Sequence, residues 1–163
     1  MNAIPKISPE SGIVSIRRES FSQLRADIEP LLKEHWKEVA HHKNEIHLDP
    51  DYERYQQGEA LGNAVMIAAR IDGRLIGYSI FALYWHIHYK NCRVAANDVL
   101  YLIPEYRKTG TGIRLIKESE RELKKVGVNF ITWHIKPEHD FSILLKRMGY
   151  IHEEIIMGKV MEN

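Results

Sequence analysis

The segment YRKTGTGIRLIK, residues 106–117, places two glycines and several basic residues directly before an apolar, periodic stretch. Gly110 and Gly112 allow the backbone to turn sharply and to approach a ligand closely. The free N–H groups at a helix start, together with the positive end of the helix dipole, favour phosphate oxygens. Arg107 and Lys108 add positive charge before the turn. The segment therefore predicts a site for a phosphate-bearing ligand rather than a turn with solvated charges.

Two common nucleotide-binding patterns fit this segment poorly. A Walker loop requires Gly-Lys followed by Ser or Thr, whereas Gly112 is followed by Ile113 and Arg114. A dinucleotide fingerprint requires a small residue where Leu115 stands, inside an early βαβ unit that the sequence does not show. The phosphate ligand must therefore be of another kind.

The elements that would position this turn follow from hydrophobic periodicity. Asp72-Gly73 is typical of a type I′ turn in a β-hairpin, and Pro30 is expected to kink or divide the first helix. The expected elements are a strand at 12–18, a helix from Phe21, a polar loop with at most one helical turn at 44–63, hairpin strands at 64–71 and 74–85, a strand at 94–103, a helix over 113–126, a strand at 129–135, a helix at 138–148 and a final strand at 150–160. This order predicts an α/β fold, a mixed sheet with helices on its faces.

The composition indicates one compact domain of an ordinary globular protein. Its 163 residues leave room for a single core, so residues 1–11 are expected to be a tail and residues 12–163 the domain. Lys plus Arg number 23 against 22 Asp plus Glu, a balance that argues against a nucleic-acid partner. One cysteine, Cys92, and the lack of a long apolar stretch favour a cytoplasmic protein with no membrane segment.

Three features together point to a family. They are the strand and loop LYLIPEYRKTGTG with its Arg-x-x-Gly-x-Gly spacing, the Asp72-Gly73 hairpin before it, and the late helix ending in KRMGY. From about residue 13 onward the chain resembles the GNAT family of acetyl-CoA-dependent N-acetyltransferases. The resemblance implies a single-domain, GNAT-like mixed central sheet flanked by helices on both faces. It also implies acetyl transfer from acetyl-CoA to a primary amine of a small molecule or protein by direct attack. Members of the family are often dimers, so a homodimer is among the partners that it implies.

The resemblance also assigns a site for acetyl-CoA. In such enzymes the fourth strand splays away from the fifth, and the pantetheine arm inserts along the exposed edge. The pyrophosphate would lie on N–H groups of the glycine turn, with Arg107 nearby. The cofactor-binding residues implied are Tyr101, Leu102, Ile103, Arg107, Lys108, Thr109, Gly110, Thr111, Gly112 and Ile113.

The implied reaction needs a base for the amine proton, and four residues are candidates. Asp98 would share a strand face with Leu100 and Leu102 if the strand is regular, and burial there would raise the pKa of its carboxyl. His134 lies at the end of a strand, and histidine is the residue type that most readily exchanges a proton near neutral pH. Glu45 and Glu59 belong to an acidic segment that would suit a cationic acceptor.

The sequence departs from the family where a proton donor for the thiolate is often found. Leu145 stands where the family often has a tyrosine, and Glu138 stands where an asparagine is common. Tyr150 is nearby, but packing is its expected role. These departures keep open a second hypothesis, a non-catalytic acyl-CoA-binding or regulatory domain of the same fold.

Two histidine pairs invite comparison with metal sites. They are His41-His42 and His86-x-His88, and the second pair would share one face of a strand. No matching cysteine or carboxylate pattern accompanies either pair, so no metal site is expected.

Overall fold

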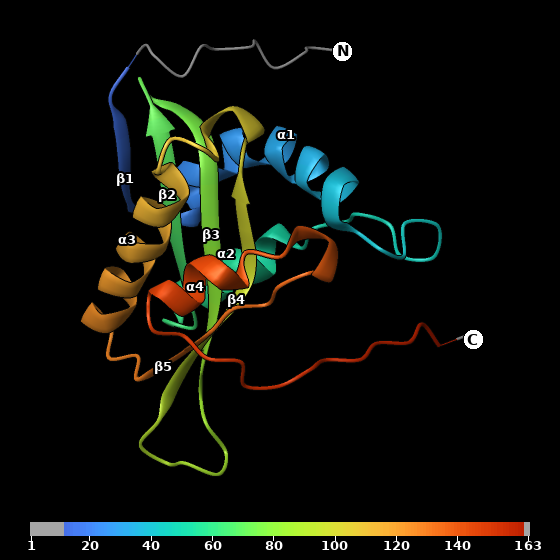
Figure 1. Ribbon diagram of the computed structural model, residues 1–163, viewed down its shortest axis with the longest axis vertical. Coiled ribbons are helices and arrows are strands. Elements are labelled where there is room, and N and C mark those ends of the chain that lie inside the picture. The colour runs from blue at the N-terminus through green and yellow to red at the C-terminus, as the bar shows by residue number, and fades with distance from the viewer. Residues whose placement is uncertain (1–11, 162–163) are drawn as a thin grey trace.

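The computed structural model describes residues 12–161, and the expected tail at residues 1–11 lies outside this range. Its elements are β1 (Val14–Arg18), α1 (Phe21–Val39), α2 (Tyr52–Ala60), β2 (Ala64–Ile71), β3 (Arg74–Trp85), β4 (Arg93–Leu102), a 3₁₀ turn at Pro104–Tyr106, α3 (Thr111–Lys125), β5 (Phe130–Thr132), a 3₁₀ turn at Pro137–His139 and α4 (Ser142–Arg147). The strands form one sheet in chain order, antiparallel except for the parallel pair β4–β5 (Figure 1). The expected α/β class with a mixed sheet is confirmed.

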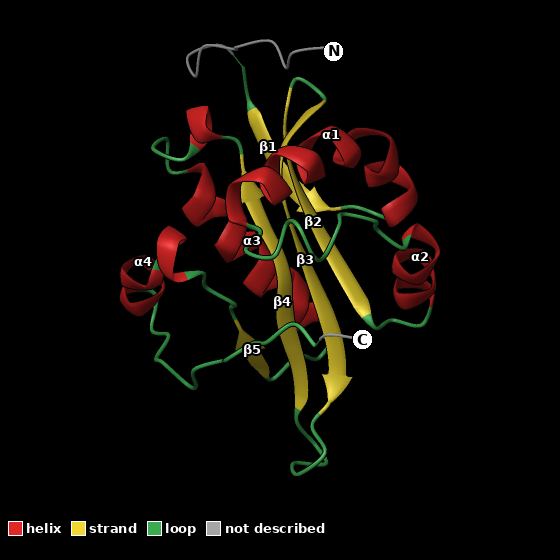
Figure 2. Ribbon diagram, turned by 90° about the vertical axis from the view of Figure 1, so that its right-hand side faces the viewer, coloured by secondary structure: helices red, strands yellow, loops and turns green. Residues whose placement is uncertain are grey.

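Helices cover both faces of the sheet. Neighbouring residues of a strand point to opposite faces, and β3 shows which helix lies on each. The hydroxyl of Tyr78 lies 3.4 Å from Nδ1 of His35 on α1, whereas Ser79 shares a 2.7 Å hydrogen bond with Ser119 on α3. Figure 2 shows α1 and α2 to one side of the strands and α4 to the other. The core therefore lies in two layers, one above and one below the sheet.

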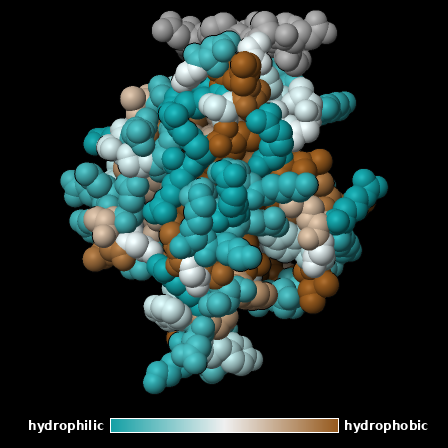
Figure 3. All heavy atoms as spheres, turned by 90° about the vertical axis from the view of Figure 1, so that its left-hand side faces the viewer, coloured by the Kyte–Doolittle hydropathy of each residue, from teal (hydrophilic) through white to brown (hydrophobic). Residues whose placement is uncertain are grey.

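The third helix has one face toward the sheet and one toward solvent. Leu115, Ser119 and Leu123 of α3 are fully buried, as their helical spacing predicts. The face of the molecule that contains β1 and α3 is mostly hydrophilic (Figure 3). The helix thus buries an apolar stripe against β1 to β3 and leaves its charged residues in water.

The hairpin predicted from Asp72-Gly73 is present between β2 and β3. Both turn residues have positive φ, 47° and 84°, as a type I′ turn requires. Every residue of β2 is buried because strands lie on both sides and helices on both faces.

Helix α1 is continuous, so of the two effects expected of Pro30, a kink or a division, the division is wrong. Ser20 caps the helix through a capping box with Gln23. Pro30 lies on the exposed side, where the hydrogen bond it removes costs least. Buried residues of the helix lie on both sides of Pro30 and pack against the sheet, which keeps the two halves in one helix; these residues are Phe21, Leu24, Ile28, Leu31 and Leu32.

The segment expected to be a loop at 44–63 contains the nine-residue helix α2. Periodicity missed it because none of its residues is buried. Local contacts support the helix instead: Asp51 accepts a 2.9 Å hydrogen bond from the Arg54 amide at the N-cap. The rings of Tyr52 and Tyr55 pack against Phe21 of α1, with centroid separations of 5.9 and 5.4 Å.

The C-terminal third is less regular than expected. The strand expected at 129–135 is only three residues long, and the helix expected at 138–148 begins at Ser142. The strand expected at 150–160 is absent, because residues 150–161 are loop. Alternating apolar residues favour a strand only where a neighbouring edge accepts the backbone hydrogen bonds, and short β5 offers little edge. Ile155 and Met157 are consequently 90% and 88% exposed.

A buried ion pair joins β2 to the segment between β1 and α1. Arg70 donates hydrogen bonds to both carboxylate oxygens of Glu19 at 3.0 to 3.1 Å and to Asp27 at 2.8 Å. The Glu19 side chain is only 2% exposed. Removing one partner of such a buried pair is strongly destabilising, because it leaves a buried charge without its main counter-ion.

Candidate active site

The strands β4 and β5 separate part-way along the sheet. β4 pairs with β3 from Arg93 to Leu102, but with β5 only from Val94 to Ala96. Within residues 12–161, no strand pairs with the β5-facing edge of β4 beyond Ala96. This opening is where the family resemblance places the pantetheine arm.

A β-bulge lies where the strands begin to separate. The register of β3 against β4 shifts between Ile80 and Phe81, so Asp98 is the extra residue on β4. The buried amide of Asn97 donates to the carbonyls of Ile80 and Val99 at 3.3 and 2.9 Å. A bulge bends its strand and turns a side chain to a new direction. Asn97 stabilises the bulge, and the sequence analysis did not single it out.

The three residues expected to bind pantetheine lie at the end of β4: Tyr101 and Leu102 are its last two residues, and Ile103 follows it. The Ile103 amide donates to the Ile76 carbonyl at 2.9 Å, so this N–H is already used toward β3. The Leu102 carbonyl accepts a 2.8 Å hydrogen bond from Nε of Arg107. The ring of Tyr101 points toward α1 and stacks on His35 with centroids 4.9 Å apart. The contribution of these three residues to cofactor binding stays a prediction.

The glycine turn has the conformation expected of an anion site. Gly110 is the N-cap of α3 with φ of 80°, in the left-handed region. The first intrahelical bond of the helix runs from the Arg114 amide to the Gly110 carbonyl at 3.2 Å. The N–H groups of Thr111, Gly112 and Ile113 precede it and have no acceptor within the helix. They lie at the positive end of the α3 dipole.

Other contacts of the loop keep it in place. The Thr109 hydroxyl donates to the Tyr106 carbonyl and lies 2.8 Å from the Thr111 hydroxyl. Gly112 packs close to Leu102, since a Cβ built on it would lie 3.8 Å from that side chain. Nothing lies within 4 Å of a Cβ built on Gly110, so the space above it is open to a ligand. This arrangement fits a pyrophosphate.

The basic residues of the loop differ in what they contact. Both Nη atoms of Arg107 donate to the Glu38 carboxylate at 2.7 Å, and this ion pair lowers the pKa of Glu38. Arg114 donates to the Val14 carbonyl of β1. Lys108 is exposed. A role of Arg107 and Lys108 in cofactor binding stays a prediction.

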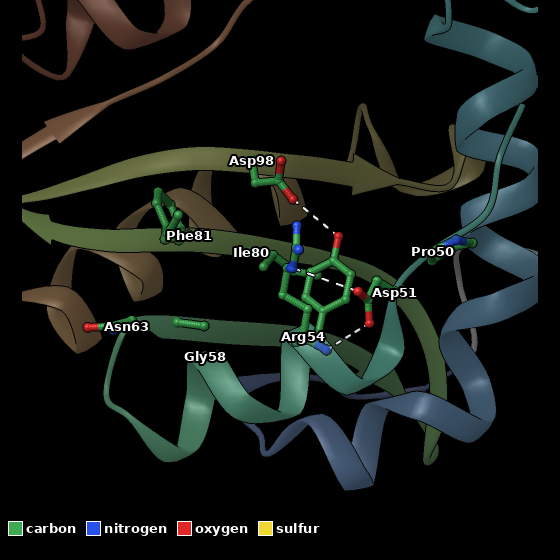
Figure 4. Close-up of a pocket in the computed structure, with 11 residues that line it drawn as sticks. Pro50, Asp51, Arg54, Gly58, Asn63, Ile80, Phe81 and Asp98 are labelled. Atoms are coloured by element: carbon green, nitrogen blue, oxygen red, sulfur yellow. Dashed lines mark hydrogen bonds and ion pairs between the residues drawn. The ribbon is translucent and has the colours of Figure 1, made fainter. Parts of the chain in front are cut away.

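A pocket of about 440 Å³ lies between α2 and the strands, beside the bulge. Figure 4 shows the Asp98 carboxylate pointing from β4 toward α2, where it accepts a 3.2 Å hydrogen bond from the Tyr55 hydroxyl. Burial, with the negative Asp98 nearby, raises the pKa of Tyr55 to about 12, so this group remains a donor. The residues that line the pocket are Pro50, Asp51, Arg54, Tyr55, Gly58, Asn63, Ala64, Ile80, Phe81, Ala82 and Asp98.

The expected surroundings of Asp98 are wrong in two respects. Asp98 is exposed rather than buried. It also faces α2, whereas Leu102 lies against Gly112 on the α3 side. The bulge is the physical reason, because one extra residue reverses the alternation of faces along the strand.

The other three proposed bases do not line this pocket. His134 follows β5 and is exposed, and Glu45 is exposed in the segment after α1. Glu59 accepts a 2.9 Å hydrogen bond from the Phe21 amide, which ties α2 to the first turn of α1. The structure therefore brings only Asp98 together with the pocket, and catalytic roles for all four stay predictions.

The positions where the family often has a proton donor are occupied differently. Leu145 is buried in α4. The Tyr150 hydroxyl donates to Glu120 of α3 at 2.8 Å, and burial raises its pKa. Its ring packs edge-on against Trp133, as the expected packing role implies.

The histidine pairs show no metal-site geometry. His86 and His88 lie in the loop after β3 rather than on one strand face, and the His88 amide donates to Nδ1 of His86. Residues 12–161 contain no group of three or more side chains arranged to hold a metal ion. In the same range, no helix is long and apolar enough to span a membrane.

Sequence comparison now adds to this geometry. The profile of the acetyltransferase (GNAT) family matches residues 25–150, most of the chain. The chain belongs to the GNAT family. It is an acetyltransferase that uses acetyl-CoA and acts on an amine acceptor. A comparison with curated proteins found no significant match.

Solved structures share the GNAT fold at low sequence identity. An aminoglycoside acetyltransferase from an uncultured soil metagenomic sample, in complex with sisomicin, aligns with a TM-score of 0.71 and 14% identity over 92% of this chain and 97% of its own. A ribosomal-protein-alanine N-acetyltransferase from Brucella melitensis biovar Abortus 2308 aligns with a TM-score of 0.68 and 16% identity over 93% and 100%. A predicted acetyltransferase from Clostridium acetobutylicum, solved with acetyl-CoA, aligns with a TM-score of 0.68 and 12% identity over 91% and 96%.

Proposed function

We propose that this GNAT acetyltransferase acetylates a primary amine bound in the pocket beside Asp98. The observation that carries the proposal is the position of Asp98. It lies on the bulge where β4 leaves β5, with its carboxylate directed into the pocket. Cofactor and acceptor would thus meet at the bulge, from opposite faces of the sheet.

Acetyl-CoA would supply a thioester whose carbonyl the neutral amine attacks directly. The residues proposed to hold it are the free N–H groups of Thr111, Gly112 and Ile113 and the exposed edge of β4. Nothing within 4 Å occupies the space of a Gly110 side chain, which supports a close approach of phosphates.

Asp98 is the proposed general base. The Tyr55 hydroxyl donates to Oδ2 of Asp98 and orients the carboxylate. A carboxylate has about four lone-pair sites, so an ammonium group can bind Asp98 while Tyr55 remains in contact. Asp98 would then take up the proton that the amine loses. Since Leu145 replaces the usual tyrosine and Tyr150 is bonded to Glu120, we propose that solvent protonates the departing thiolate.

The pocket suits a small cationic acceptor. Its volume lies within the range of about 300 to 1,000 Å³ that is usual for small-molecule sites. Asp51 and Asp98 contribute negative charge, and Arg54 lies 3.7 Å from Asp51. Structural neighbours act on aminoglycosides and on ribosomal-protein alanine. Of these two classes, the pocket favours an amino sugar over a protein terminus.

The test is an amine screen that detects free thiol released from acetyl-CoA, followed by Asp98→Asn. We expect kcat to fall by about 100-fold, as for loss of a general base, with little change in acetyl-CoA affinity. His134→Gln and Glu45→Gln serve as controls and should retain activity. Full activity in Asp98→Asn would overturn the assignment of the base, and loss of activity in His134→Gln would transfer it to His134.

A homodimer and a cytoplasmic location stay predictions. Light scattering of the purified protein at several concentrations measures the first, and fractionation of the source cells measures the second. A monomer at all concentrations would contradict the homodimer.

A further inference from the structure

The last turn of α1 contacts segments on both sides of the cofactor opening. Glu38 binds Arg107, which follows β4, through two hydrogen bonds of 2.7 Å. His139, which follows β5, has Nε2 3.3 Å from the Glu38 carbonyl and Nδ1 3.6 Å from its carboxylate. Nearby, His41 lies 3.0 Å from the carboxylate of Glu138. The end of α1 therefore bridges the place where the two strands separate.

Arg107 is fully engaged in this bridge. Its Nε donates to the Leu102 carbonyl, its two Nη atoms bind Glu38, and its guanidinium lies 5.6 Å from the centre of the Tyr101 ring. The paired, planar geometry gives this contact a defined orientation. The side chains are 39% and 26% exposed, so solvent screens the pair only in part. The Arg107 side chain therefore links the loop to α1, and its donors are already used by protein groups rather than directed at a phosphate.

The segment that follows the last turn of α1 reaches the acceptor pocket. α1 ends at Val39, and residues 40–51 connect it to α2. This connection ends at Pro50 and Asp51, which line the pocket. The last turn of α1 and the pocket wall are therefore joined by one connecting segment, residues 40–51.

We propose that Glu38 is a positioning residue that couples cofactor binding at the 107–113 loop to the order of the 40–51 segment. The proposal rests on the assignment of the acetyl-CoA and acceptor sites above. A bound pyrophosphate would restrain the loop, and the restrained Arg107 would hold Glu38 in its paired position. Coupling of this kind requires an element with two arrangements, here the paired and unpaired states of Glu38 and Arg107. Acetyl-CoA would thus order the acceptor side before the amine binds.

The test is hydrogen exchange of the full-length protein with and without coenzyme A, which needs no knowledge of the acceptor. In the wild type we expect coenzyme A to slow exchange at 108–114 and also at 40–51, the latter by at least about fivefold, the lower end of coupling between sites. Glu38→Gln should retain the protection at 108–114 and lose it at 40–51. Glu34→Gln is the matched control, because Glu34 lies on the same helix and its ion pair within residues 12–161 is with exposed Lys37 at 2.8 Å.

The decisive quantity is the change in the hydrogen-exchange rate of residues 40–51 when coenzyme A is added. A purely stabilising role of Glu38 would change only the exchange rate without coenzyme A. Protection at 108–114 without protection at 40–51 in the wild type would overturn the coupling. Equal protection of 40–51 in Glu38→Gln and wild type would overturn the role of Glu38. Neither result would affect acetyl transfer or the role of Asp98, which the amine screen tests separately.

Discussion

His35 is expected to make the stability of this protein depend on pH between 6.5 and 4. The side chain lies on α1 against the rings of Tyr78 and Tyr101. Burial, assisted by the positive Arg107, lowers its pKa from 6.5 to about 4, although Glu38 acts in the opposite direction. Above pH 6.5 the imidazole is neutral in both the folded and unfolded states. As the pH falls below 6.5, the unfolded chain binds a proton that the folded protein does not, so the free energy of unfolding decreases.

The size of the effect follows from the shift. Each pH unit between the two pKa values contributes about 1.36 kcal/mol, so the loss should reach about 3 kcal/mol near pH 4. Below pH 4 both states bind the proton and the contribution of His35 stays constant. The stability that neutral His35 contributes is fully present above the pKa that this residue has in the unfolded chain. It is lost as the pH falls to the lower pKa that His35 has in the folded protein.

Urea unfolding followed by tryptophan fluorescence, at half-unit steps from pH 7.5 to 4, measures this loss. His35→Phe retains a ring against Tyr101 but cannot titrate, so its stability should fall less steeply than that of the wild type. His134→Gln, which changes an exposed histidine, should follow the wild type. Carboxylates titrate in all three proteins and cancel in the comparison. Parallel curves for the wild type and His35→Phe would refute the reasoning.

Three further predictions concern the cofactor loop, the core and the base. Gly110→Asp and Gly127→Asp each place a side chain on left-handed backbone, with φ of 80° and 79° and no atom within 4 Å of the new Cβ, so each should lower the free energy of unfolding by about 1 to 2 kcal/mol. Calorimetry should show that Gly110→Asp loses coenzyme A binding and that Gly127→Asp retains it. Equal binding by the two variants would contradict the assignment of the loop. Arg70→Met should lower the free energy of unfolding by about 3 kcal/mol, because it removes the buried partner of Glu19 and leaves only the exposed Arg17, at 3.1 Å, in contact with that carboxylate; urea denaturation that shows a negligible loss would contradict this. Tyr55→Phe should lower kcat by about tenfold, as for one hydrogen bond to a charged group, and an unchanged rate would mean that Tyr55 does not orient the base.

The elements that the sequence predicted correctly depend mainly on local physics. Asp72-Gly73 adopts the two positive φ values that its residue types favour, and the strand before Pro104 ends at Leu102, one residue before its expected end. The turn at Gly110 opens α3 with free N–H groups, as two glycines before an amphipathic stretch indicate. Each of these features involves residues that are close in the chain, so residue type and spacing were sufficient.

Features that depend on distant partners were missed or misplaced. The continuity of α1 through Pro30 depends on packing against the sheet, and α2 depends on ring contacts with Phe21. The strand expected after Tyr150 has no edge of adequate length beside it. Periodicity reports what a segment can bury, but not whether a surface exists to receive it.

The same division applies to the candidate active site. The sequence by itself determined the family and the conformation of the glycine turn, because the turn is a local conformation of a few residues from Arg107 to Ile113. Only the tertiary structure decided that Asp98 faces α2, because a bulge requires a neighbouring strand to define its register. Likewise, only the tertiary structure brought Glu38 to Arg107, a residue 69 positions away. Contacts between distant segments depend on the free energy of packing the whole chain, and no short stretch of sequence contains that information.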